Sequence, residues 1–76
     1  MIMKLNKQIE AMINDNFVDN TSYAKTFDLG FINDSEMYDE TEFDNVTSAS
    51  ELKKLWLDFC QENGFEINNL IYIERK

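Results

Sequence analysis

The spacing of apolar residues changes along this 76-residue chain, and the changes dictate the order of its helices and strands. Over residues 3–16 the apolar side chains recur at spacings of three and four, which places them on one face of a helix. These residues, with their flanks, are Ile2, Leu5, Ile9, Met12, Ile13 and Phe17. From Tyr23 the period becomes two, so we expect a half-buried strand. Its apolar face holds Tyr23, Phe27, Leu29 and Phe31, with Lys25 as the odd residue.

A second helix is predicted over residues 48–63. Ser48 and Glu51 have the spacing of a capping box, and Gly64 suits a left-handed C-terminal cap. The apolar residues between them again have helical spacing: Leu52, Leu55, Trp56, Phe59 and Cys60. After this helix the period returns to two, which predicts a last strand from Phe65. The apolar face of that strand is expected to hold Phe65, Ile67, Ile71 and Ile73.

The segment 36–43 has two interpretations. Met37, Thr41 and Phe43 alternate with Tyr38, Glu40 and Glu42, as in the second strand of a hairpin that turns at residues 33–35. Its dense like charge is equally typical of an extended acidic loop. Both interpretations remain open at this stage.

Together these elements predict a single α+β domain over residues 1–76, in the order α-β-β-α-β. Because both helices have one apolar face, we expect them to pack on one face of a three-stranded, largely antiparallel sheet. The other face of the sheet is then expected to be acidic, with two exposed tyrosines. Its residues are Thr26, Asp28, Tyr38, Glu40, Glu42, Leu70, Tyr72 and Glu74.

The formal net charge of −8 belongs to one segment of the chain. Between Lys25 and Lys53 there is no basic residue, and residues 26–52 contain eight acidic ones. The remainder of the chain is balanced, with seven acidic and seven basic residues. Because dense like charge lowers stability, such a segment indicates a binding surface.

The residue inventory argues against catalysis and against a cofactor. The chain has no histidine and only two glycines, so it lacks the usual general base and a phosphate-binding loop. Cys60, the one cysteine, lies on an apolar helix face, where a structural thiol is expected. A calcium loop starting at Glu40 would have Asn45 where such loops need glycine. We therefore expect no enzyme, metal site or cofactor.

The charge also restricts the partners and the location. An acidic domain is repelled by nucleic acid and by anionic membranes, and no apolar run approaches the roughly 20 residues of a membrane span. With one cysteine and no signal-like segment, the chain is expected to be cytoplasmic. The oligomeric state stays open between monomer and dimer.

The partner expected for an acidic segment is a basic protein surface. Side chains on one face of a strand repeat about every 6.5–7 Å. A row of carboxylates at that interval can follow a basic groove that normally holds a nucleic-acid backbone. The predicted partner-binding residues are Asp28, Asp34, Glu36, Met37, Tyr38, Asp39, Glu40, Glu42 and Asp44.

In size, acidity, lack of catalytic residues and richness in Asn, Lys and Ile, the chain resembles small inhibitor proteins of phages and mobile elements. Anti-CRISPR proteins and antirestriction DNA mimics are of this type. The resemblance implies a non-catalytic inhibitor of a nucleic-acid-binding defence complex in a bacterial host cell. Two alternatives remain: an acidic adaptor or regulatory domain that binds a basic partner without mimicry, and a homo-oligomeric phage accessory protein that assembles through an apolar sheet face.

Overall fold

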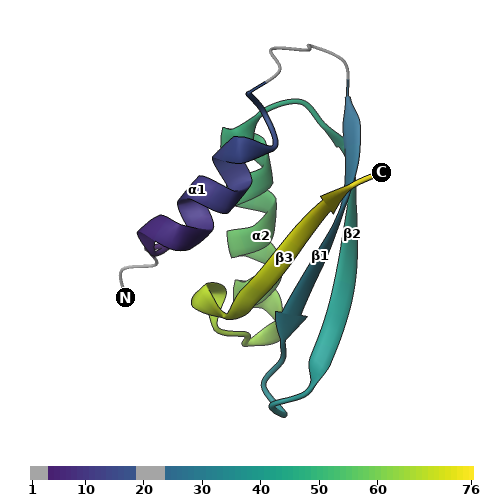
Figure 1. Ribbon diagram of the computed structural model, residues 1–76. Coiled ribbons are helices and arrows are strands. Elements are labelled where there is room, and N and C mark those ends of the chain that lie inside the picture. Colours follow the sequence, from purple (N-terminus) through teal and green to yellow (C-terminus); the bar gives the residue numbers. More distant parts are fainter. Residues whose placement is uncertain (1–3, 19–23) are drawn as a thin grey trace.

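A computed structural model describes residues 4–18 and 24–76. Two helices pack on one face of a three-stranded antiparallel sheet with strand order β2-β1-β3 (Figure 1). The elements are α1 (Lys7–Asp15), β1 (Lys25–Ile32), β2 (Tyr38–Val46), α2 (Ala49–Asn63), the 3-10 turn η1 (Ile67–Asn69) and β3 (Leu70–Arg75). The predicted class and the order α-β-β-α-β are confirmed.

The capping residues decide where the two helices begin. The Asn6 side chain accepts a hydrogen bond from the Ile9 N–H at 2.9 Å, so α1 begins at Lys7. The predicted start at residue 3 was therefore too early. For α2, the predicted Ser48 cap is present, because its Oγ accepts from the Glu51 N–H at 3.1 Å. Glu51 reaches back to the N–H of Thr47, and Gly64 ends the helix in the left-handed conformation.

Of the segment 36–43, residues 38–43 form part of the strand β2, so the strand interpretation is confirmed for them and residues 36 and 37 belong to the turn. Phe27 lies opposite Phe43 and Leu29 opposite Thr41, which sets the predicted alternation. Asn33 forms the turn, because its Oδ1 accepts from the Ser35 N–H at 2.9 Å and from the Met37 N–H at 3.1 Å. The turn needs one left-handed residue, and Glu36 adopts it with φ 60°.

The last strand differs from its prediction. Alternation does not continue from Phe65, because the Glu66 side chain accepts from the Asn68 N–H and starts η1. At the start of β3 the register with β1 shifts, and Ile71 is the extra residue. As a result Leu70, predicted for the outer face, is buried, whereas Ile71, predicted for the core, is 49% exposed.

The core lies between the helices and the inner face of the sheet. Its fully buried side chains come from α1, α2, β1 and β2: Ile13, Phe27, Leu29, Phe31, Val46, Leu52, Trp56 and Cys60. Trp56 Nε1 donates to the Ile67 carbonyl at 2.9 Å, which satisfies its buried polar atom. Lys25 is buried on the same face, with Nζ 5.3 Å from the Phe17 ring centre. Ile2 and Tyr23, which were assigned to apolar faces, lie outside the described residues.

Candidate functional site

The outer face of the sheet carries a row of three carboxylates. Asp28 of the central strand lies opposite Glu42 on one side and Glu74 on the other. Residues directly opposite each other share a face, and like charges in such positions repel. The predicted acidic outer face is therefore present, and this row needs a compensating cation.

Lys76 supplies a cation for two of these three carboxylates, Asp28 and Glu42. Its backbone N–H donates to the Thr26 carbonyl at 2.9 Å, which continues the pairing of the C-terminus with β1. Its Nζ lies 2.7 Å from Glu42 Oε2 and 3.5 Å from Asp28 Oδ2. The hydrogen bond and charge of Lys76 lower the pKa of Glu42, while the same contacts raise the pKa of Lys76. Lys76 comes from outside residues 26–52, so the excess negative charge of that segment is partly compensated in the folded chain, which the sequence pattern does not predict.

Two tyrosines lie next to this row and cross the central strand. Tyr38 donates to the Tyr72 hydroxyl at 2.9 Å, and Tyr72 donates to Glu40 Oε2 at 2.9 Å. The rings are stacked, with their centres 6.4 Å apart. Gly30 makes this arrangement possible, because a Cβ there would lie 2.6 Å from Tyr72 Cδ1 and 2.9 Å from the Tyr38 hydroxyl oxygen. The hydrogen bonds with Tyr38 and Glu40 raise the pKa of Tyr72.

Five exposed acidic residues that form no ion pair with any residue the structure describes lie along β2 and its turn. We call the following five residues the acidic edge: Asp34, Glu36, Asp39, Glu40 and Asp44. In the described part of the chain none of them forms an ion pair, in contrast to Asp28 and Glu42. Asp39 Oδ1 accepts from the Glu40 N–H at 2.8 Å. All five are exposed, and beside them Met37 is 63% and Tyr38 51% exposed.

The structure places seven of the nine predicted binding residues in two connected regions, and Asp39 and Asp44 outside both. Four of them are on the outer face of the sheet: Asp28, Tyr38, Glu40 and Glu42. Three are in or beside the hairpin turn: Asp34, Glu36 and Met37. Asp39 lies opposite inward-facing Phe31, so it belongs to the other side of β2, and Asp44 lies at the register shift before Val46. The set follows one strand and its turn and does not share one face.

Tyr72 and Lys76 contact predicted binding residues but were not themselves predicted. Tyr72, in β3, donates a hydrogen bond to Glu40, and Lys76, directly after β3, forms an ion pair with Glu42. A signal for Tyr72 existed, since a glycine inside a strand often marks a close approach by another group. No local pattern could have placed Lys76 over Glu42, because that contact depends on the pairing of β3 with β1.

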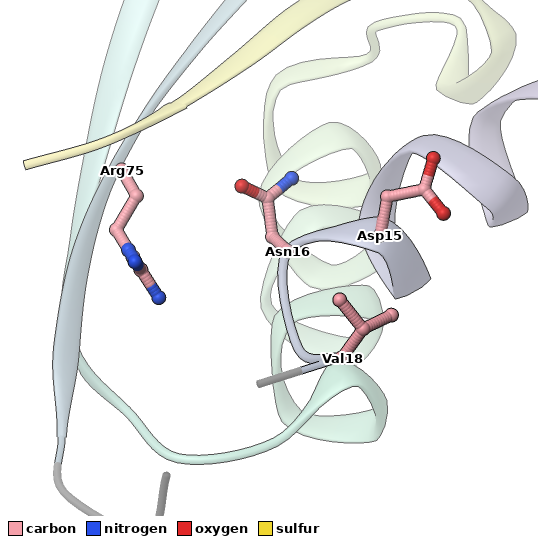
Figure 2. Close-up of a pocket in the computed structure, with 4 residues that line it drawn as sticks. All are labelled: Asp15, Asn16, Val18 and Arg75. Atoms are coloured by element: carbon pink, nitrogen blue, oxygen red, sulfur yellow. The ribbon is translucent and has the colours of Figure 1, made fainter. Parts of the chain in front are cut away.

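A shallow pocket of about 200 Å³ lies elsewhere, between the end of α1 and the end of β3. Asp15, Asn16, Val18 and Arg75 line it, and the Asp15 side chain points away from Arg75 (Figure 2). Asp15 is the one carboxylate among these lining residues. None of the predicted binding residues contributes to it.

Residues 4–18 and 24–76 contain no group of three or more His, Cys, Asp or Glu side chains arranged to hold a metal ion. Burial raises the pKa of the Cys60 thiol to about 12, so the thiol stays protonated. No helix in this part of the chain has the length and apolar character needed to cross a membrane.

Comparison with protein-family models, with curated proteins and with solved structures gives no match for this chain.

Proposed function

We propose that this protein is a non-catalytic inhibitor that occupies the basic nucleic-acid-binding groove of a bacterial defence complex. It binds through the acidic edge and competes with nucleic acid for the groove. One observation supports this above the others: five exposed carboxylates without an ion pair among the described residues lie along one strand and its turn, beside Asp28 and Glu42, which both contact Lys76. These five uncompensated charges fall within residues 34–44, and all five side chains are exposed.

The backbone geometry suits a groove that holds a sugar-phosphate chain. β2 has nine residues, which at about 3.3 Å per residue extend over roughly 30 Å. Asp39 lies on one side of β2, whereas Glu40 and Glu42 lie on the other, so a basic groove can contact carboxylates from both walls. Met37 and Tyr38 are exposed within this charge and can provide apolar contacts that slow dissociation.

Glu36 adds a second line of support. A non-glycine residue at φ 60° is strained, and glycine or asparagine would suit that turn position better. Residues that break a local rule are expected where function requires them. The strain therefore favours a binding role for the Glu36 carboxylate.

An adaptor that binds a basic partner without mimicry would use the same acidic edge. Competition with nucleic acid separates the two functions. Self-assembly through the outer face has less support, because that face carries the carboxylates of Asp28, Glu42 and Glu74 in place of an apolar surface.

The test compares two triple variants of equal charge change. The first, Glu36→Gln, Asp39→Asn and Asp44→Asn, removes three charges of the acidic edge. The control, Asp15→Asn, Asp58→Asn and Glu62→Gln, removes three exposed charges from the helices. Wild type and control are expected to capture a nucleic-acid-binding protein from a bacterial lysate at low salt and to release it on adding nucleic acid.

The acidic-edge variant is expected to lose that capture. Retention of the captured protein in the presence of excess nucleic acid would favour the adaptor. Equal capture by both triple variants would show that the acidic edge is not the binding surface, and the proposal would be wrong.

A further inference from the structure

β2 is an edge strand whose outer side has no strand neighbour in the described part of the chain. The strand order is β2-β1-β3, and β2 forms the border of the sheet in Figure 1. Its residues from Tyr38 to Asp44 are exposed or half-buried. An open edge presents N–H and C=O groups that can pair with another extended chain.

The hydrogen-bonding phase identifies which groups these are. The Asn33 N–H donates to the Met37 carbonyl at 2.9 Å, which makes residues 33 and 37 a hydrogen-bonded pair. Hydrogen-bonded and non-hydrogen-bonded pairs alternate along an antiparallel ladder. Tyr38, Glu40 and Glu42 are therefore the residues whose backbone groups face the open side. The contact from Asp39 to the Glu40 N–H confirms the phase, because Asp39 Oδ1 occupies one of those donors at 2.8 Å.

The charge on this edge selects against a second copy of the chain. Two β2 strands side by side would place the acidic edges of both copies against each other, which repels. A strand with Lys or Arg side chains, placed beside β2, would instead be attracted to the carboxylates of the acidic edge. The other edge, β3, has a different character, since it is shorter and has Arg75 and Lys76 at its end. An extended basic segment therefore matches β2 better than β3.

We propose that β2 accepts an extended basic segment of the partner as a fourth strand of the sheet. This inference rests on the proposed function and specifies how the acidic edge holds its partner. Backbone groups of Tyr38 and Glu42, with the Glu40 carbonyl, bind the main chain of that segment, and the neighbouring carboxylates pair with its Lys or Arg side chains. Asp39 acts as a competitor that occupies the Glu40 N–H while the edge is free.

The probe is a synthetic peptide, acetyl-Lys-Val-Lys-Thr-Lys-Val-Lys-amide, added to the full-length protein. Two versions carry N-methyl groups on alternate amides in opposite phase, which leaves their charge unchanged. We expect the parent peptide to bind, and one methylated version to lose at least about thirtyfold in affinity, the factor for two net hydrogen bonds. Amide exchange should slow at Tyr38 and Glu42 and stay unchanged at Ile71 and Ile73.

Three results would overturn the inference: no binding by the parent peptide, equal binding by both methylated versions, or protection at β3 in place of β2. Asp39 provides a matched pair of variants. Asp39→Ala and Asp39→Asn lose the same charge, but only the alanine frees the Glu40 N–H, so it should bind about fivefold more tightly than the asparagine variant. If these tests fail while nucleic acid still displaces the captured partner, the strand-pairing mode is wrong and the proposed function stands.

Discussion

Replacing Glu36 by glycine is expected to stabilise the protein although it removes an exposed, charged side chain from a turn. Glu36 has φ 60°, a conformation that is strained by about 1–2 kcal/mol for an L-residue with a side chain. Glycine lacks this strain, but it is freer in the unfolded chain, which offsets roughly 0.5–1 kcal/mol. The central values give a net gain from the backbone of about 0.75 kcal/mol, which for a domain of this size raises Tm by about 3–6 °C.

Glu36→Gln is the matched control for this measurement. It removes the same charge from the acidic edge and keeps the left-handed strain, so the difference between the two variants isolates the backbone contribution. Urea and thermal unfolding of both variants should be followed at low and high salt, since screening removes the charge contribution that they share.

Equal stability of the glycine and glutamine variants would refute the reasoning that residue 36 is strained. If the glycine variant is more stable but binds the partner less well, the two results together show a residue retained for binding at the expense of stability.

Two more perturbations act on the outer face of the sheet. Gly30→Ala should displace the Tyr72 ring and break its hydrogen bonds, so a spectrophotometric titration should show the pKa of Tyr72 falling toward its ordinary value; an unchanged pKa would contradict the packing at Gly30. Lys76→Met should change how stability depends on pH. Lys76 lowers the pKa of Glu42, so that carboxylate stabilises the fold above its unfolded pKa, and the contribution is lost as the pH falls through the folded pKa. In urea unfolding the acid-side loss should be smaller for Lys76→Met than for wild type, whereas the exposed control Lys54→Met should keep it.

Helix ends and strand faces that depend on residues close together in the sequence were predictable from it. Ser48, Glu51 and Gly64 determine the ends of α2, and all three are recognisable from residue type and spacing. The alternation of Phe27, Leu29 and Phe31 likewise predicted the buried face of β1. Both kinds of evidence act over a few residues, and the fold class follows from them.

The errors arose where register or a side-chain contact decides the structure. A hydrogen bond from the Asn68 N–H to Glu66 replaced the expected strand by η1, and the register shift at Ile71 then exchanged its burial with that of Leu70. In the candidate site, too, local patterns were predictable and long-range contacts were not. The acidic residues on β2 were predicted from charge density, but the ion pair of Glu42 with Lys76 depends on the pairing of strands far apart in the sequence.

The most direct test of the proposed function is a competition titration with the purified partner. Fluorescence anisotropy of a labelled nucleic acid bound to that partner should fall to the free value as this protein is added, with an apparent Kd for the nucleic acid that rises in proportion to inhibitor concentration. The variant Glu36→Gln, Asp39→Asn and Asp44→Asn should inhibit at least about tenfold more weakly, taking about 0.5 kcal/mol for each exposed charge. A ternary complex in which the nucleic acid keeps its affinity would contradict the account.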